Sequence, residues 1–174
     1  DSSGLERFVR LDSVERNSCV GTVVKTVEGK GEPAVLVTLY QALIKSDRFE
    51  YALQKGVEAG VSRFVPFMSE RTEVEPPSSS KLTRWRRIIR EAAEQSGRSI
   101  LPELAMSGSL ELFLKSVSGA AIIPWEQKSV AGIRKVLTEF QKNEKLRCSE
   151  VSVFIGPVGG FTHDEIQMAE QSGV

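Results

Sequence analysis

The sequence has one histidine, two cysteines, no net charge and no long apolar run in its 174 residues. The single histidine, His163, excludes metal sites and catalytic triads that need a second histidine. Cys19 and Cys148 have no metal-binding spacing, and a pair of reduced thiols is typical of a cytoplasmic protein. The chain opens without a signal-peptide pattern, and its apolar stretches are far too short to cross a bilayer. We therefore expect a cytoplasmic protein without a membrane partner or a metal, whose nucleic-acid-binding surface, if it has one, is local.

The composition indicates a globular protein, because 40% of the residues are hydrophobic and 26% are charged. Strand-like and helix-like patterns alternate along most of the chain, which predicts an α/β fold with a mostly parallel sheet and helices on both faces. The predicted strands are Ala34–Leu39, Val61–Phe67, Ala120–Pro124 and Val151–Ile155. The predicted helices are a first one capped by Asp47 and closed by Gly60, then Leu82–Ser96, Ser109–Val117, Ser129–Phe140 and His163–Ser172.

The first 33 residues follow a different pattern. Phe8–Leu11 and Gly21–Val27 read as two strands, and the stretch Glu28–Pro33, rich in glycine and proline, follows them. Two strands cannot form a core alone, so they belong to an incomplete β domain or pack on the α/β body. We place the domain boundary here, with a partial β domain at 1–33 and an α/β domain at 34–174.

The segment between Val151 and Ile166 is the strongest candidate for a ligand site. A buried strand leads into Gly156-Pro-Val-Gly-Gly160, and a helix start follows, with Thr162 as its N-cap, Glu165 closing a capping box, and Phe161 and Ile166 available as a hydrophobic staple. Ligands of α/β proteins bind at such strand ends, where glycines allow close approach to the backbone. A tight turn without a ligand is the alternative.

The helix predicted over 82–96 and its flanks carry six basic residues against two acidic ones. Arg84, Arg87 and Arg90 lie opposite the apolar face on a helical projection. An arginine row of this kind suits phosphate groups and predicts salt-dependent RNA binding. A solvated amphipathic helix is the alternative.

Two further polar residues lie near predicted strand ends or helix starts. Glu126 follows the strand at 120–124, where sheet ligands bind, although a surface carboxylate fits equally well. His163 opens the last helix as an exposed residue of its first turn. The glycine turn lacks a P-loop lysine and the spacing of a dinucleotide fingerprint.

Six segments, in this order, resemble one family closely. They are Gln41–Glu50, Gln54–Val61, Pro66–Arg71, Arg84-Trp85, Glu91–Arg98 and Ile155–Phe161. They resemble the RsmE family of small-subunit ribosomal RNA uridine methyltransferases, within the SPOUT superfamily. This resemblance implies a PUA-like β barrel, then an α/β domain whose end forms a trefoil knot, a homodimer, and methylation of uridine ring nitrogen 3 with S-adenosylmethionine as cofactor.

The resemblance also implies roles for particular residues. It assigns cofactor binding to Glu126, Ile155, Gly156, Pro157, Gly159 and Gly160. It places Glu70, Arg71, Gln95, Ser96 and Arg98 near the site or the RNA, and with the arginine row this gives an RNA surface of Arg71, Arg84, Arg87, Arg90 and Arg98.

The sequence departs from the family at several positions. Val158 stands where the family usually has glutamate, and Ile44, Ser46 and Ala59 replace a usual proline, glycine and leucine. The resemblance puts the catalytic arginine in a segment beyond Val174 that also closes the knot, and without that segment we expect weak cofactor binding and no turnover. Two alternatives stay open: a SPOUT methyltransferase for another RNA site, and a catalytically weakened RNA-binding or ribosome-assembly protein.

Overall fold

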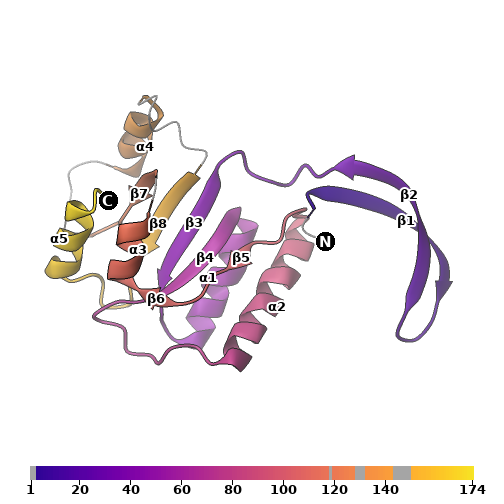
Figure 1. The fold of residues 1–174 in the computed structure, drawn as a ribbon, viewed down its shortest axis with the longest axis horizontal. Coiled ribbons are helices and arrows are strands. Elements are labelled where there is room, and N and C mark those ends of the chain that lie inside the picture. The colour runs from indigo at the N-terminus through magenta and orange to yellow at the C-terminus, as the bar shows by residue number, and fades with distance from the viewer. Residues whose placement is uncertain (1–2, 118, 128–131, 143–149) are drawn as a thin grey trace.

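The computed structural model describes residues 3–117, 119–127, 132–142 and 150–174 (Figure 1). The strands are β1 Leu5–Val14, β2 Cys19–Glu28, β3 Leu36–Ala42, β4 Val61–Met68, β5 Glu103–Leu104, β6 Gly108–Ser109, β7 Ala120–Ile122 and β8 Glu150–Ile155. The helices are α1 Ser46–Glu58, α2 Ser79–Ser96, α3 Leu110–Ser116, α4 Ile133–Lys142 and α5 His163–Gln171.

A parallel sheet forms the centre of the molecule. Its strand order is β5-β4-β3-β8-β7, and β6 pairs with the end of β4. All of these pairings are parallel, so the carboxyl ends of the strands meet at one edge of the sheet, which lies at the bottom of Figure 1. The predicted α/β fold with a mostly parallel sheet is confirmed.

Helices cover both faces of this sheet, as predicted. On one face Phe67 and Phe154 pack with residues of α3 and α5, and Tyr40 stacks on Phe154 with ring centroids 4.2 Å apart. On the other face α1 and α2 pack together, with Phe49 stacked on Trp85 at 4.2 Å. Burial of each such aromatic side chain contributes about 2–3 kcal/mol, so the two cores fix which face each helix covers.

Local signals place most helix ends correctly. Thr162 and Glu165 form the predicted capping box, and Gly97 ends α2 with φ +68°, a left-handed conformation that glycine adopts readily. The prediction for Asp47 is wrong. Lys45 is the N-cap of α1 and makes no side-chain cap bond, and Asp47 lies in the first turn, where its charge still favours the helix dipole. The Ser78 hydroxyl caps α2, so this helix starts three residues before Leu82.

Strand pairing moves other boundaries. Strand β3 starts at Leu36, where pairing with Glu150 begins, and continues to Ala42, which pairs with Phe67. The helix predicted from Ser129 is observed as α4 from Ile133, and Ser129 itself lies outside the described residues. None of the helices in the described part of the chain has the length and apolar character needed to cross a membrane.

Strands β1 and β2 form an antiparallel ribbon that projects from the body (Figure 1). The two predicted strands are confirmed and are longer than expected, with ten residues each. Every residue of the two strands is exposed except Val27, which is half-buried. The ribbon therefore contributes almost nothing to the core, and its position depends on how its base meets the body.

Candidate functional site

Three loops meet at the carboxyl edge of the sheet. Strand β8 ends at Ile155 and continues into the glycine turn Gly156–Gly160, β4 continues into Ser69-Glu70-Arg71, and the chain after β7 reaches Glu126. The chain builds the sheet outward from β3 on one side through β4 and returns on the other side through β7 and β8. A reversal of strand order of this kind creates the crevice in which α/β proteins bind ligands.

The glycine turn is compact and exposes its backbone. The Gly160 N–H donates to the Pro157 carbonyl at 2.9 Å, and Gly160 has φ +70°, which a residue with a side chain rarely adopts. A Cβ on Gly160 would lie 3.8 Å from the Glu126 carboxylate, so the β7 loop flanks the turn. Val158 is 75% exposed, so a glutamate at this position would meet solvent rather than the core.

Arg71 and Glu70 connect the β4 loop to the glycine turn and the start of α5. The Arg71 guanidinium donates through Nη1 to the Gly159 carbonyl at 2.6 Å. The Thr162 hydroxyl donates to the Glu70 carboxylate at 2.9 Å. Two neighbouring residues of the β4 loop therefore hold the carboxyl-terminal end of the turn and the N-cap that follows it.

Glu165 joins the β4 loop to the start of α5. Its side chain is only 7% exposed, and its carboxylate accepts from the Ser69 hydroxyl at 2.8 Å, the Glu70 N–H at 2.9 Å and the Thr162 N–H at 2.9 Å. The sequence predicts only the local capping bond. The bonds to Ser69 and Glu70 span more than ninety residues and have no sequence signal.

The β7 loop also contacts α5. The Trp125 ring meets the His163 ring edge to face, with centroids 5.1 Å apart, and His163 is exposed as predicted. The loop that carries Glu126 is thereby tied to the helix that follows the glycine turn. In the described residues, no cluster of three or more histidine, cysteine or acidic side chains could hold a metal.

The arginine row lies on the solvent face of α2, as predicted. Arg84 is 62% exposed and donates two hydrogen bonds to the Glu50 carboxylate, at 2.7 and 2.8 Å, and these bonds raise the pKa of Arg84. Arg87 forms an exposed ion pair with Glu91 at 3.4 Å. Arg90 is exposed and has no ion-pair partner within the described ranges. Phosphate groups therefore have direct access to Arg90 and compete with carboxylates at the other two.

A hollow of about 680 Å³ lies between α1 and α2, away from the glycine turn. Its lining includes Asp47, Glu50, Glu58 and Glu91, with Tyr51 and Gln54. Carboxylates of this density repel phosphate, so the hollow does not extend the arginine row as an RNA surface.

Comparison with known proteins identifies the family. The model of the RNA methyltransferase domain family matches residues 31–174. A protein of Aquifex aeolicus named ribosomal RNA small subunit methyltransferase E is 30% identical, over 95% of this chain and 68% of that protein. The chain belongs to the ribosomal RNA small subunit methyltransferase E family. The resemblance stated from the sequence motifs is confirmed.

The chain spans only part of the length of further members of the methyltransferase E family. The Synechocystis member is 34% identical over 87% of this chain, which spans only 49% of that relative's length. A crystal structure of the Neisseria gonorrhoeae member bound to S-adenosyl methionine has a TM-score of 0.85 at 25% identity, covering 99% of this chain and 69% of that one. The fold described above is therefore the fold of the family.

The residues that the methyltransferase E resemblance assigns to cofactor binding, from Ile155 to Gly160 together with Glu126, do lie together at the carboxyl edge, and Arg71 joins them. Arg98 does not. It follows the end of α2, its side chain is 4% exposed, and its guanidinium is bonded to Glu32 and to the Val61 carbonyl at the opposite edge of the sheet. This placement does not support Arg98 as an RNA contact, because a buried, paired guanidinium has no free donor directed at solvent. Gln95 and Ser96 lie near that edge too, in the last turn of α2.

Proposed function

We propose that this chain carries the S-adenosylmethionine site of an enzyme that methylates a uridine at ring nitrogen 3 in small-subunit ribosomal RNA. The observation that carries the proposal is the open glycine turn Gly156–Gly160 at the strand-order reversal, braced by Arg71 and flanked by Glu126. Relatives named ribosomal RNA small subunit methyltransferase E support the choice of RNA, and the neighbour bound to S-adenosyl methionine supports the cofactor.

The turn fits this cofactor chemically. Gly160 has no side chain, and only the Glu126 carboxylate lies within 4 Å of the position that a Cβ would take, so an adenine ring can lie against the backbone there, where N–H and C=O groups recognise its edge. The Glu126 carboxylate beside Gly160 is an acceptor for hydroxyl or ammonium groups. When bound, S-adenosylmethionine supplies a methyl group activated by a sulfonium, and the protein's part is to align that methyl with the target nitrogen and to exclude competing orientations.

The residues of this chain then act chiefly by positioning. Arg71 fixes the Gly159 carbonyl, and Glu165 fixes the backbone of the β4 loop against the start of α5. Removal of the weakly acidic proton from the uridine needs a further group. We give no residue of this chain that role.

Isothermal titration calorimetry of the intact protein with S-adenosylmethionine tests the cofactor site. We expect saturable binding that falls when the glycine turn is altered, and no measurable heat at millimolar cofactor would overturn the proposal. Transfer of a labelled methyl group by the intact protein to unmodified small-subunit ribosomal RNA, followed by nucleoside mass spectrometry, tests the target atom. Product other than 3-methyluridine would indicate a SPOUT methyltransferase with another RNA site.

The second candidate is a catalytically weakened RNA-binding or ribosome-assembly protein of the same fold. One observation favours it: Val158 replaces the usual glutamate in the turn. Because Val158 is 75% exposed, Val158→Glu should not disturb folding. If the variant binds S-adenosylmethionine tightly while the natural chain binds only RNA, the second candidate holds.

For the RNA surface we propose Arg71, Arg84, Arg87 and Arg90. Replacing Arg84, Arg87 and Arg90 with glutamate should weaken RNA binding and flatten its salt dependence, because each lost phosphate contact lowers the slope of log K against log salt by about 0.9. Lys115, an exposed lysine on α3, offers a charge-matched control for Arg90. If Lys115→Glu and Arg90→Glu reduce RNA affinity equally, the arginine row is only a solvated helix face.

The finer fold and assembly belong to the same proposal. We propose that the intact protein has the trefoil knot, the PUA-like barrel that includes residues 1–33, and the homodimeric state that the resemblance implies, and that it acts in the cytoplasm. Sedimentation equilibrium tests the dimer, and a monomer at micromolar concentration would contradict it.

A further inference from the structure

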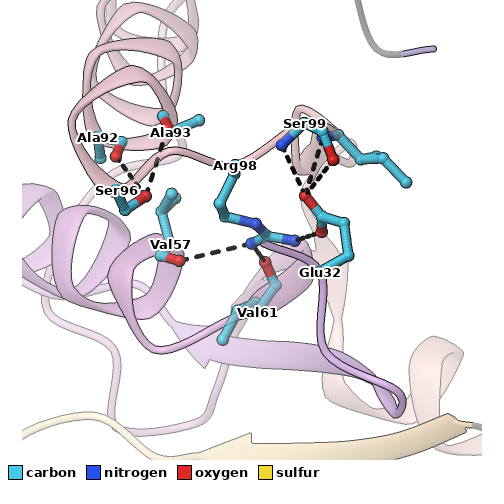
Figure 2. A network of polar contacts seen from close by, with 9 residues as sticks. Glu32, Val57, Val61, Ala92, Ala93, Ser96, Arg98 and Ser99 are labelled. Atoms are coloured by element: carbon cyan, nitrogen blue, oxygen red, sulfur yellow. Dashed lines mark hydrogen bonds and ion pairs between the residues drawn. The ribbon is translucent and has the colours of Figure 1, made fainter. Parts of the chain in front are cut away.

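Glu32 and Arg98 form a largely buried ion pair whose carboxylate and guanidinium also bond to the backbone of other segments (Figure 2). The Glu32 carboxylate accepts from Arg98 Nη2 at 2.6 Å, the Ser99 N–H at 3.0 Å and the Ile100 N–H at 2.9 Å. The other end of the guanidinium donates through Nη1 to the Val61 carbonyl at 2.5 Å. The Arg98 side chain is 4% exposed and that of Glu32 20% exposed, so little water reaches the pair.

This ion pair lies where the ribbon meets the body. Glu32 belongs to the segment between β2 and β3, whereas Arg98 follows α2, and Val61 begins β4. The same segment fits tightly around the pair. A side chain at Gly29 would collide with the Ser99 hydroxyl, and one at Gly31 would come within 2.7 Å of the Gly97 carbonyl. The base of the ribbon is therefore clamped against the end of α2.

Stability alone does not explain an ion pair at this place. Well-packed apolar residues of the same volume stabilise a protein as well as a buried ion pair does. A pair in which one guanidinium and one carboxylate share several fixed partners does, however, allow only one relative arrangement of the segments that it joins. The geometry thus selects an orientation of the ribbon as well as adding binding energy.

The orientation matters because α2 connects the clamp to the proposed site. The 18 residues of α2 span about 27 Å, from the carboxyl edge of the sheet, where the β4 loop enters it, to the clamp at Arg98. The arginine row lies between these two ends. Beyond the clamp, the ribbon displays Phe8 and Lys25 as a cross-strand pair, with the lysine 5.7 Å from the ring centroid. An exposed aromatic ring beside a cation suits an unpaired base and its phosphate.

We infer that Glu32 and Arg98 are positioning residues that hold the β1–β2 ribbon at a fixed angle to α2, so that one RNA contacts the ribbon and the arginine row together. The inference rests on the proposed RNA substrate and adds a role that the cofactor site does not need. When two RNA-binding surfaces are held rigidly together, binding of the RNA to one raises its effective concentration at the other, and the overall affinity increases. If the ribbon moves freely relative to α2, much of this increase in affinity is lost.

The distance between two spin labels measures the orientation of the ribbon directly. One label is attached to Cys19, which is exposed at the tip of the ribbon, and Cys148→Ser removes the other natural cysteine. Thr83→Cys, at the far end of α2, carries the second label. We expect a narrow distance distribution for the parent chain. Glu32→Gln removes the charge that Arg98 pairs with and should broaden it, and Arg98→Lys, which keeps the charge but not the two-ended guanidinium, should broaden it less.

RNA binding gives the second readout. In Glu32→Gln we expect the affinity for small-subunit ribosomal RNA to fall by about tenfold or more, with S-adenosylmethionine affinity unchanged. In the intact enzyme the KM for RNA should rise while kcat stays the same. Lys25→Glu should weaken RNA binding in the parent and add little in Glu32→Gln. Glu58→Gln, which removes an exposed ion pair with Lys55, is the matched control and should change neither readout.

The outcomes separate the two proposals. If Glu32→Gln broadens the distance distribution but leaves RNA affinity unchanged, the positioning role is overturned and the methyltransferase proposal stays intact. The same conclusion follows if the distribution stays narrow in Glu32→Gln. If the parent chain binds no RNA, both proposals fail. A thermal melt of each variant establishes that the body remains folded, and Arg98→Lys provides a second, milder test if Glu32→Gln unfolds.

Discussion

Two glutamates fasten loops at opposite edges of the sheet, and they do so with different partners. At the carboxyl edge Glu165 is 7% exposed and accepts hydrogen bonds from the Ser69 hydroxyl and from two backbone N–H groups. At the amino edge Glu32 is 20% exposed and accepts from two backbone N–H groups and from the Arg98 guanidinium. One carboxylate is stabilised by neutral donors, and the other is stabilised by neutral donors and a cation.

The two edges differ in the charge that these contacts bring. Glu165 fixes its loops with neutral donors, so its contacts add no cation beyond the Arg71 guanidinium that bonds the Gly159 carbonyl. Each added cation near a site proposed for a positively charged sulfonium ligand would repel that ligand. At the amino edge the Arg98 guanidinium bonds both Glu32 and the Val61 carbonyl and joins the ribbon to the body.

The largest effect is expected at the carboxyl edge. Glu165→Ala removes the capping box and leaves the Ser69 hydroxyl and the Glu70 N–H without their acceptor. Loss of the cap costs about 1 kcal/mol, and the buried unpaired donors add about 1–3 kcal/mol. We expect the free energy of unfolding to fall by about 3 kcal/mol in urea titrations, together with a loss of S-adenosylmethionine affinity.

Glu165→Gln is the matched control, because it keeps one acceptor oxygen and nearly the same volume. Its destabilisation should be about 1 kcal/mol. If alanine and glutamine at this position prove equally harmful, the negative charge rather than the hydrogen-bond geometry holds the loops, and the contrast drawn between the two edges is wrong.

A smaller loss is expected at the amino edge. Arg98→Met leaves Glu32 without its cation and the Val61 carbonyl without its donor. Breaking a fully buried pair costs about 3–5 kcal/mol, but Glu32 is partly exposed and regains water, so we expect about 2 kcal/mol. Urea unfolding measures this value, and cofactor affinity should not change. A drop in S-adenosylmethionine binding would show that the two edges are coupled.

Two glycines allow the edges to be compared with the same substitution. Gly160 at the carboxyl edge has φ +70° and Gly97 at the end of α2 has φ +68°. A Cβ on Gly160 would lie 3.8 Å from the Glu126 carboxylate, and one on Gly97 would meet no atom within 4 Å, so neither would clash. Alanine at either position should cost about 1 kcal/mol through backbone strain alone. Calorimetry should find weaker S-adenosylmethionine binding only for Gly160→Ala. Equal cofactor affinity in both variants would remove the turn from the proposed site.

At both edges, local signals of the sequence predicted the short-range contacts and missed the long-range ones. The Thr162–Glu165 capping box and the Gly97 helix end depend on residues a few positions apart, so the sequence pattern contains them. The Glu165 bond to Ser69 and the Glu32 bond to Arg98 join residues 96 and 66 positions apart. No local pattern encodes which distant donor a carboxylate will meet, because strand order decides it.

Arg98 illustrates the consequence. The family resemblance placed it near the site or the RNA, yet the chain leaves α2 at Gly97 in a left-handed conformation, and Arg98 lies inward against Val61. The arginines about two to four turns earlier remain on the solvent face. The sequence therefore grouped these arginines together, but only the fold distinguishes the exposed ones from the one that is buried and paired.

The smallest effect is a response of the ribbon to acid. Burial by itself raises the pKa of Glu32, but hydrogen bonds from Arg98, Ile100 and Ser99 and the charge of Arg98 together lower it below its ordinary value. A lowered pKa in the folded state means that the carboxylate stabilises the clamp fully above the unfolded pKa of about 4.3, and that this contribution is lost as the pH falls through the lower folded value. The Cys19–Thr83→Cys distance distribution should therefore stay narrow down to about pH 4 and broaden below it. In Glu32→Gln, which has no proton to gain, the distribution should be broad throughout and independent of pH, and broadening of the parent near neutral pH would mean that another group controls the ribbon.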